Sequence, residues 1–350
     1  MIRITRDALV PVLSQILTAA GAPETSAAQV AASLVENNLV GHDSHGVLRV
    51  TSYVEAILSG RLDPHGTLRV TRESATTALI DGGRGFGQMV LRQAMEMAMD
   101  KAREHDVAVV TVRNCGHTGR MGEYAVQAAE EGFIATVMGT GSRKGGTVAP
   151  FGSVSPAFNT NPMAWAVPAG RFPAVFFDFA TSVVAWGKIE AAIDKDVPIP
   201  AGWLLDAEGN PTTDPQDQKR GGVLLPFGAH KGSGLAFMVE ALAGGLTGVG
   251  CAPLPTYTSD FGTVLTALNV EAFLPLAEYR QMMDDLIEAI KAGRPAPGVE
   301  EILVPGESEW RSREERLRNG LELPEATWQR VVDAAERCGV RIPEVVQPTE

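Results

Sequence analysis

Residues 107–119 read VAVVTVRNCGHTG, a run of β-branched and small residues followed by a loop that contains His117. Such a run is typical of a strand that is buried on both faces of a sheet. The preceding residues, 88–105, predict a long helix, and 122–131 and 133–138 predict a second helix and a second buried strand. Because strands and helices alternate here, the sequence predicts an α/β layered core.

The two ends of the chain differ from this middle part. Helices are expected there in five segments, 5–21, 27–38, 47–58, 308–319 and 324–338. A strongly apolar helix is also expected at 235–246, while the proline-containing stretch 196–222 is interpreted as a long surface excursion.

The composition is that of a globular protein. The chain has 350 residues, of which 45% are hydrophobic and 21% charged, and this length suggests about two domains. The 30 Lys and Arg residues against 42 Asp and Glu residues give a net charge of −12, so phosphate backbones and anionic lipids are repelled. Neither nucleic acid nor a membrane is therefore expected as a partner.

Cysteine usage predicts a reducing environment. Cys115, Cys251 and Cys338 are odd in number and far apart, and no Cys/His ligand spacing occurs, so neither a disulfide framework nor a zinc site is expected. The first residues lack the apolar run of a signal peptide, and no run of 18 apolar residues occurs. A cytoplasmic location is expected.

A glycine-rich stretch, 81–87 (DGGRGFG), invites comparison with a dinucleotide fingerprint. The fingerprint needs G-x-G-x-x-G and an acidic residue about 20 positions later, whereas the spacing here is G-x-G-x-G. We therefore interpret the stretch as a tight turn and do not expect a Rossmann fold.

Polar residues near position 45 suggest a carboxylate pocket. If the chain is helical from residue 47, His45, Arg49 and Tyr53 share one face, and a guanidinium binds a carboxylate through two parallel hydrogen bonds. The alternative is a solvated helix face. His42 and His45 have the spacing of a metal pair, but no third ligand lies nearby, so no metal is expected.

His117 stands in a glycine-flanked loop directly after the buried strand. The carboxyl ends of strands are where α/β proteins hold ligands and catalytic groups, and the ordinary pKa of histidine suits acid–base chemistry. The alternative is a hydrogen-bonded loop histidine with no chemical role. Likewise Lys188 is by default a solvated lysine, while Lys231, at the start of an apolar helix, suits phosphate or carboxylate.

Eight motifs in collinear order resemble the malate/L-lactate dehydrogenase family, which is distinct from the Rossmann lactate dehydrogenases. They are SHGxxRxxxY (44–53), VRNxxH (112–117), TNPMA (160–164), DFATS (178–182), GKI (187–189), IPxGW (199–203), PTTDP (211–215) and PGE (305–307). Sulfolactate, ureidoglycolate and diketogulonate oxidoreductases and Δ1-piperideine-2-carboxylate reductases belong to the same family.

The resemblance implies a non-Rossmann α/β fold like that of L-sulfolactate dehydrogenase, with a mixed sheet and a helical N-terminal segment. It further implies a homodimer that binds NAD(P). The implied parts are a helical domain (1–75 with 308–350), a substrate and dimerisation core (76–120 with 235–307) and a cofactor-binding domain (121–234).

The resemblance also assigns roles to residues. His117 matches the proton donor and acceptor, and Ser44 and His45 match the polar pair beside the substrate. Arg49 matches the carboxylate partner. Tyr53 and Asn161 are expected to contact the substrate too, and Lys188 stands where some members carry an acidic relay residue. The matches to cofactor contacts are Thr140, Gly141, Lys144, Asp178, Ala180, Thr181, Leu225, Phe227, Lys231, Gly232, Pro305, Gly306, Glu307 and Arg313.

The implied reaction interconverts a small 2-hydroxy acid, similar to malate or lactate, and its 2-oxo acid by hydride transfer. Arg49 would hold the carboxylate, and protonated His117 would donate to the carbonyl oxygen. NAD is the expected cofactor, although Arg143 and Lys144 would also suit the 2′-phosphate of NADP.

Three departures from the family pattern concern the substrate rather than the reaction class: Gly116-His-Thr-Gly119, Asn159-Thr-Asn-Pro162 and Lys231-Gly-Ser-Gly234. A cyclic imine carboxylate is the alternative substrate. Alternatives from other classes are a ligand-binding homologue without turnover and a metal-dependent hydrolase built on His42, Asp43 and His45.

Overall fold

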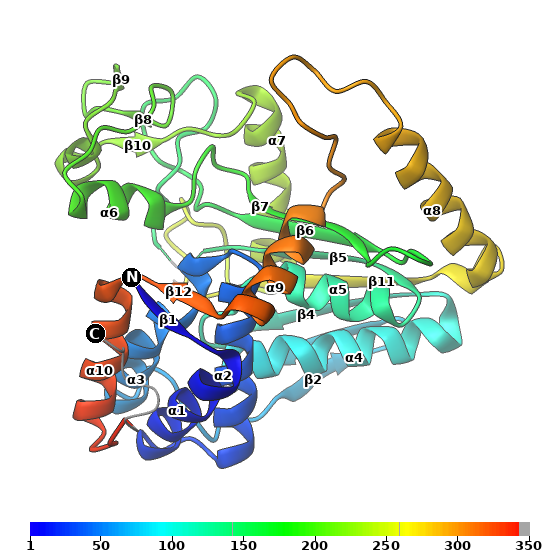
Figure 1. The fold of residues 1–350 in the computed structure, drawn as a ribbon, viewed down its shortest axis with the longest axis horizontal. Coiled ribbons are helices and arrows are strands. Elements are labelled where there is room, and N and C mark those ends of the chain that lie inside the picture. Colours follow the sequence, from blue (N-terminus) through cyan, green and yellow to red (C-terminus); the bar gives the residue numbers. More distant parts are fainter. Residues whose placement is uncertain (142, 259, 343–350) are drawn as a thin grey trace.

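The computed structural model describes residues 1–141, 143–258 and 260–342. Ser142 of the expected cofactor loop, and residues 343–350 of the expected helical domain, lie outside the described residues. At the centre of the described part is a seven-stranded sheet (Figure 1). In spatial order its strands are β2 (Arg69–Glu73), β3 (Thr77–Asp81), β4 (Val107–Arg113), β11 (Thr263–Asn269), β5 (Phe133–Gly139), β6 (Pro162–Val167) and β7 (Val175–Ala180).

The sheet is mixed, as expected. β3 and β4 pair in parallel, and the other neighbours are antiparallel. Thr263 of β11 pairs with both Val112 and Gly139, so the carboxyl ends of β4 and β5 meet at one edge. Ala180, the last residue of β7, pairs with Pro162 at the start of β6, which places it at the same edge. We call this the β4–β5 edge.

Helices cover both faces of the sheet. On one face lie α4 (Gly87–His105) and α5 (Gly122–Glu130), and on the other lies the π-helical segment η4 (Glu240–Leu246) that continues α7 (His230–Val239). Val110 packs in the apolar cluster of the α4 side, whereas its neighbour Val109 packs against the η4 side. The expectation that this strand is buried on both faces is confirmed, because alternate side chains point to opposite faces.

The two ends of the chain meet in a second, helical cluster (Figure 1). Strand β1 pairs with β12 and so joins the N-terminal helices to the C-terminal one. The elements are β1 (Ile2–Ile4), α1 (Arg6–Ala19), α2 (Glu24–Leu39), η1 (Asp43–His45), η2 (Val47–Arg49), α3 (Val50–Leu58), β12 (Leu321–Leu323) and α10 (Glu325–Arg337). The short 3-10 turn η2 therefore replaces the start of the helix expected from residue 47.

The stretch 196–222 is more ordered than expected. It belongs to a small sheet with a buried cluster of its own, in which Ile199, Leu204 and Val148 are packed. The elements are β8 (Leu204–Leu205), β9 (Pro211–Thr212), η3 (Pro215–Arg220) and β10 (Val223–Leu224). Apolar residues spaced between the prolines and glycines are the reason, because they bury surface that a plain loop would expose.

The remaining elements are α6 (Trp186–Asp194), η5 (Val270–Ala272), α8 (Leu276–Lys291) and α9 (Glu307–Asn319). Helix α8, for which the sequence analysis had no expectation, stands out from the body at the right of Figure 1. The buried carboxylate of Asp284 anchors it by accepting hydrogen bonds from the backbone of Gly170 and Arg171 at 2.9 and 2.8 Å. Among the described helices, none is long and apolar enough to cross a membrane.

Candidate active site

The loop that carries His117 is held by the glycine-rich turn at 82–87. The amide of Gly116 donates to the carbonyl oxygen of Gly85 over 2.8 Å. A Cβ atom added to Gly87 would lie 2.5 Å from the carbonyl oxygen of His117, so only glycine lets α4 begin this close to the loop. The stretch is a tight turn, as interpreted from the sequence, and it packs against the loop that carries His117.

Two buried asparagines at the end of α2 shape the turn that carries His45. The Asn38 Oδ1 accepts the amide of Val47 at 2.7 Å, and Asn37 Nδ2 donates to the carbonyl oxygen of His45 at 3.1 Å. A Cβ on Gly46 would lie 2.0 Å from Asn38 Oδ1, so this position tolerates no side chain without a shift. The sequence analysis missed both asparagines, although two adjacent amides at the apolar end of a helix are an unusual pattern.

Five of the predicted residues come together at the β4–β5 edge. The imidazole rings of His45 and His117 are stacked, with centroids 5.7 Å apart and planes inclined by 13°. Tyr53 Oη lies 2.9 Å from His117 Nδ1, and Ser44 Oγ lies 3.2 Å from His45 Nδ1. Arg49 donates through Nε to the carbonyl oxygen of Ser44 over 2.7 Å. We call these five residues the histidine cluster.

The electrostatics of the histidine cluster favour neutral imidazoles. Burial, followed by the charges of His45 and Arg49, holds the pKa of His117 well below its ordinary value. Burial and then Arg49, His42 and Arg120 lower the pKa of His45 to about 3. Both side chains are nevertheless partly exposed, so a small molecule can reach them. At neutral pH the cluster therefore presents two uncharged rings beside one guanidinium.

Two further residues complete the histidine cluster and were not predicted. The buried Gln88, near the start of α4, donates from Nε2 to Tyr53 Oη over 2.6 Å. The ring of Phe261 meets His117 edge-on with centroids 5.8 Å apart. The sequence analysis had no expectation for either residue, because neither belongs to a motif that it singled out.

Lys188 and Asn161 make different contacts. The start of α6 approaches the histidine cluster, because a Cβ on Gly187 would lie 3.8 Å from Ser44 Cβ, and the adjacent Lys188 is exposed. Asn161 is fully buried and donates from Nδ2 to Glu240 Oε1 at 2.9 Å, which ties the start of β6 to η4. The catalytic role expected for Lys188 and the substrate contact expected for Asn161 remain predictions.

Most of the predicted cofactor residues lie at the same edge of the sheet, on loops and on the elements that border them. The amide of Thr181 donates to Thr160 O at 2.9 Å, and the amide of Phe227 donates in turn to Thr181 O at 3.0 Å. Asp178, on β7, is partly buried and accepts the amide of Gly122 at 2.7 Å, and burial raises its pKa. The others are Thr140, Gly141, Lys144 and Leu225 on loops, Ala180 at the end of β7, and Lys231 and Gly232 in the first turn of α7.

The other four predicted cofactor residues lie elsewhere. Pro305 O accepts the amide of Phe176, near the start of β7 and away from the β4–β5 edge, at 3.3 Å, and Gly306 packs on the Phe176 ring. Glu307 pairs with Lys291 Nζ at 2.6 Å, and Arg313 pairs through Nε with Glu36 at 2.6 Å.

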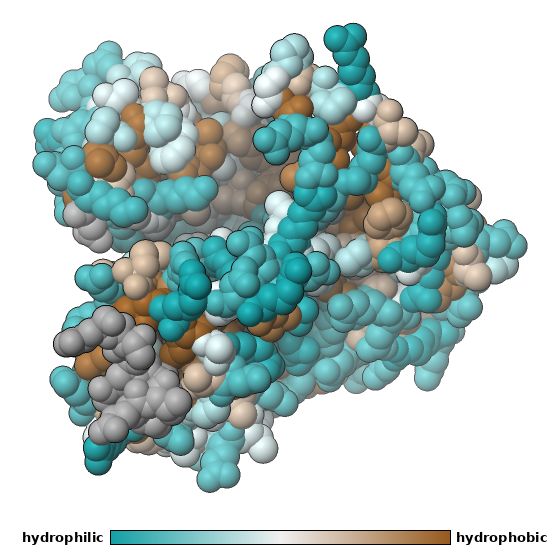
Figure 2. Space-filling view, viewed as in Figure 1, coloured by the Kyte–Doolittle hydropathy of each residue, from teal (hydrophilic) through white to brown (hydrophobic). Residues whose placement is uncertain are grey.

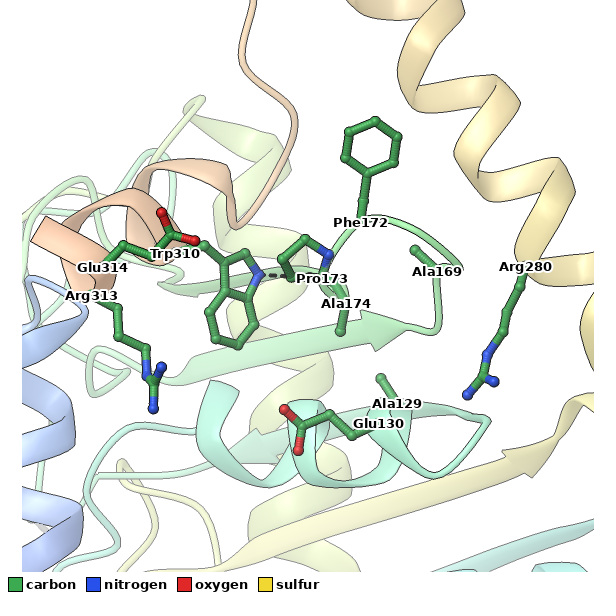
Figure 3. Close-up of a pocket in the computed structure, with 10 residues that line it drawn as sticks. All are labelled: Ala129, Glu130, Ala169, Phe172, Pro173, Ala174, Arg280, Trp310, Arg313 and Glu314. Atoms are coloured by element: carbon green, nitrogen blue, oxygen red, sulfur yellow. Dashed lines mark hydrogen bonds between the residues drawn. The ribbon is translucent and has the colours of Figure 1, made fainter. Parts of the chain in front are cut away.

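Arg313 also lines a cavity of about 360 Å³ with Glu130, Trp310 and Arg280. Figure 3 shows these side chains converging on it from α5, α9 and α8. The adjoining residues Phe172 to Ala174 precede β7, so the cavity lies at the edge opposite Ala180. It is therefore separate from the histidine cluster.

His42 does not form a metal pair with His45. Its Nε2 lies 3.5 Å from Glu309 Oε1 on α9. In the described ranges, no three His, Cys, Asp or Glu side chains are grouped closely enough to hold a metal ion.

The comparisons with known proteins identify the family of the chain. Residues 4–332 match the malate/L-lactate dehydrogenase family. Malate dehydrogenase of Pyrococcus horikoshii is 39% identical over 97% of this chain and 96% of its own. Its solved structure has a TM-score of 0.87 at 36% identity, covering 97% of this chain and 96% of that chain.

Two other solved structures are also similar to this chain. Sulfolactate dehydrogenase of Methanocaldococcus jannaschii has a TM-score of 0.87 at 34% identity and 98% coverage of both chains. Δ1-Piperideine-2-carboxylate reductase of Pseudomonas syringae has a TM-score of 0.82 at 28% identity, covering 96% of this chain and 100% of that chain. The expected family and fold are thereby confirmed: the chain belongs to the malate/L-lactate dehydrogenase family of oxidoreductases.

Proposed function

We propose that the chain is an NAD-dependent oxidoreductase that interconverts a small 2-hydroxy acid and its 2-oxo acid, with His117 as general acid and base. The observation that carries the proposal is the histidine cluster, in which a partly exposed imidazole stands beside a guanidinium. Relatives named malate, sulfolactate and hydroxycarboxylate dehydrogenases support the substrate class.

Arg49 is suited to bind the carboxylate. Its Nε is engaged by Ser44 O, and its terminal amino groups make no hydrogen bond to the described residues. Those two groups can grip one carboxylate and so orient the adjacent carbon toward His117. Loss of either terminal amino group would weaken binding of the carboxylate and would also leave the substrate less well oriented toward His117.

His117 is suited to hold the proton of the reacting oxygen. The positive charge of Arg49 is one cause of its lowered pKa. A bound carboxylate neutralises that charge, so substrate binding raises the pKa of His117 and favours the protonated donor. The donor then stabilises the oxygen as negative charge develops, an effect typically worth about 10²–10⁴-fold in rate.

The polar and charged residues at the β4–β5 edge suit the binding of a dinucleotide. Asp178 supplies a carboxylate for a hydroxyl group, and exposed Lys231, in the first turn of α7, supplies a cation for phosphate. When bound, NAD supplies the hydride acceptor and NADH the donor. Thr140, Thr181 and Gly232 would line the same site.

Two contacts favour NAD over NADP. The Arg143 guanidinium lies over the Trp186 ring at 4.9 Å, and Lys144 Nζ donates to the carbonyl oxygen of Pro255 over 3.1 Å. Both cations that suited a 2′-phosphate therefore have protein partners.

A homodimer is supported by the apolar surface of α8. Met282, Leu286 and Ile290 recur every four residues and are 54%, 50% and 44% exposed. Figure 2 shows apolar surface between the segment that contains α8 and the rest of the molecule. A stripe of this kind on a helix that leaves the body suits a second copy of the chain.

The test is a spectrophotometric screen at 340 nm with NADH and NADPH separately, against pyruvate, oxaloacetate, sulfopyruvate and Δ1-piperideine-2-carboxylate. We expect oxidation of NADH by one of the oxo acids. Turnover of the imine alone would instead favour the chemistry named for the Pseudomonas syringae neighbour. No turnover together with no binding of either dinucleotide would overturn the proposal.

A further inference from the structure

Gln88, Tyr53 and His117 form a short chain of hydrogen bonds that ends at the proposed acid–base group. Gln88 Nε2 lies 2.6 Å from Tyr53 Oη, which lies 2.9 Å from His117 Nδ1. The backbone amide of Gly119 also points at His117 Nδ1, with a nitrogen–nitrogen distance of 3.3 Å. Each link joins a different element, since Gln88 belongs to α4 and Tyr53 to α3.

The Gly119 amide decides the direction of these bonds. A backbone N–H can only donate, so the facing Nδ1 of His117 must be the unprotonated nitrogen. Tyr53 can then donate its hydroxyl hydrogen to Nδ1, and its oxygen is free to accept from Gln88. In neutral His117 of the free protein the ring proton therefore lies on Nε2, the nitrogen that neither Gly119 nor Tyr53 faces.

We propose that Gln88 is a positioning residue that acts through Tyr53 on Nδ1 of His117, so that the ring protonated on both nitrogens can give its Nε2 proton to the oxygen of an oxo acid and remain neutral, with the other proton held on Nδ1 by Tyr53. This inference rests on the function proposed above for His117. Gln88 touches neither the ring nor the site of the reacting oxygen, so its effect passes through the tyrosine hydroxyl.

An amide suits this position better than other polar side chains. With Nε2 directed at Tyr53, the glutamine stabilises the Nε2–H form of His117. After a half-turn of the amide, Oε1 would accept the tyrosine hydroxyl, and Tyr53 could then accept a proton on Nδ1. One residue thus supports both the Nε2–H ring of the free protein and the ring with its proton on Nδ1, which is left after Nε2 has donated and whose bare Nε2 can take the proton of a hydroxy acid.

A carboxylate at position 88 could not both donate to and accept from the Tyr53 hydroxyl as the amide can. Gln88→Glu keeps the shape of the side chain but can only accept when ionised, so the tyrosine hydroxyl would turn toward it. Tyr53 would then accept from Nδ1, and the negative charge would favour a positively charged ring. The other ionisable groups around His117 are His45 and Arg49, and Glu123 acts on Tyr53, all of which the substitution leaves in place.

The experiment measures two properties of the parent, Gln88→Glu, Gln88→Leu, Tyr53→Phe and His117→Ala. The first is kcat/KM for oxaloacetate with NADH between pH 5 and 9. The second is the ¹⁵N chemical shifts of the histidine rings, assigned by the loss of signals in His117→Ala. Gln93→Glu is the matched control, because Gln93 is an exposed glutamine on the same helix.

We expect the parent to have the proton on Nε2 of His117, and Gln88→Leu to have a mixture of both tautomers with kcat lowered about 10-fold and KM nearly unchanged. In Gln88→Glu the rate profile should move to higher pH by one unit or more, while Gln93→Glu follows the parent. Thermal unfolding identifies any variant that fails to fold. If Gln88→Leu is such a variant, the inference is tested with Gln88→Glu and Tyr53→Phe, which nearly preserve the shape of the side chain.

The inference is overturned if His117 carries its proton on Nδ1 in the parent, or if both Gln88 variants keep the parent's tautomer and pH profile while His117→Ala is inactive. Full activity of His117→Ala would instead overturn the proposed function itself. The two failures are therefore distinguishable.

Discussion

His45 and His117 stack ring on ring, with centroids 5.7 Å apart, although they are 72 positions apart in the chain. A positive charge on one ring disfavours a charge on the other, and the guanidinium of Arg49 disfavours both. Two neutral rings are therefore favoured in the free protein, and the function proposed above requires a bound carboxylate to help His117 take up a proton.

Replacement of His117 by alanine should lower kcat at least about 10²-fold, because the proton donor is lost. Dinucleotide affinity, measured by fluorescence titration, should remain within about 2-fold, because the predicted cofactor contacts lie on other loops. His105→Ala, which changes an exposed histidine, is the control. A His117→Ala enzyme with parental kcat would contradict the assignment.

The variant Arg49→Lys should chiefly raise KM for the 2-oxo acid, by about 10-fold or more, since an ammonium group cannot form the paired hydrogen bonds of a guanidinium. Steady-state kinetics at saturating NADH measure the effect. Arg61→Lys alters an exposed arginine and should leave KM unchanged. A parental KM in Arg49→Lys would show that the carboxylate binds elsewhere.

Acid should weaken the folded state through His45. Its pKa is about 3 in the fold, chiefly because of burial and then Arg49, against an ordinary value of 6.5. As the pH falls below about 6.5, the unfolded chain takes up a proton that the folded chain excludes, so the free energy of unfolding decreases. The loss is at most about 1.4 kcal/mol per pH unit, down to a pH of about 3.

Urea unfolding at pH 7 and pH 5 isolates this contribution. His45→Asn should lose less stability on acidification than the parent, while His105→Asn, an exposed control, should lose as much as the parent. Equal losses in all three proteins would mean that His45 is protonated in the folded state.

The variant Gly46→Ala should destabilise the protein by about 1–3 kcal/mol, because the new methyl group overlaps Asn38 Oδ1. It should also lower activity, since Asn38 and Gly46 shape the turn that carries His45. The control is Gly245→Ala, where a Cβ meets no atom of the described residues within 4 Å. Chemical denaturation compares the two, and similar stabilities would contradict the overlap.

Leu286→Glu should separate the proposed dimer, because a charge in the middle of the α8 stripe cannot be buried without a partner. Sedimentation velocity should give a dimer for the parent and a monomer for the variant. Leu317→Glu changes an apolar residue of similar exposure on α9 and should stay dimeric. A monomeric parent would remove the basis for this proposal.

Local patterns were enough to predict the central elements. The β-branched run before His117 forms β4, the Phe133 stretch forms β5, and both are buried because the side chains on each face are apolar. The glycine spacing at 82–87 correctly excluded a dinucleotide fingerprint. Patterns failed where short strands depend on distant partners, as in the small sheet that contains β8.

The sequence by itself determined the α/β class, the helical ends and which side chains are candidates for the chemistry, because propensity, periodicity and residue chemistry act over a few neighbours. Only the tertiary structure decided that His45, Tyr53 and Gln88 surround His117. Their contacts join the segment 37–53, the start of α4 and the loop after β4, and no local preference brings such segments together. Packing of α2, α3 and α4 beside the sheet does so, by burying their apolar faces.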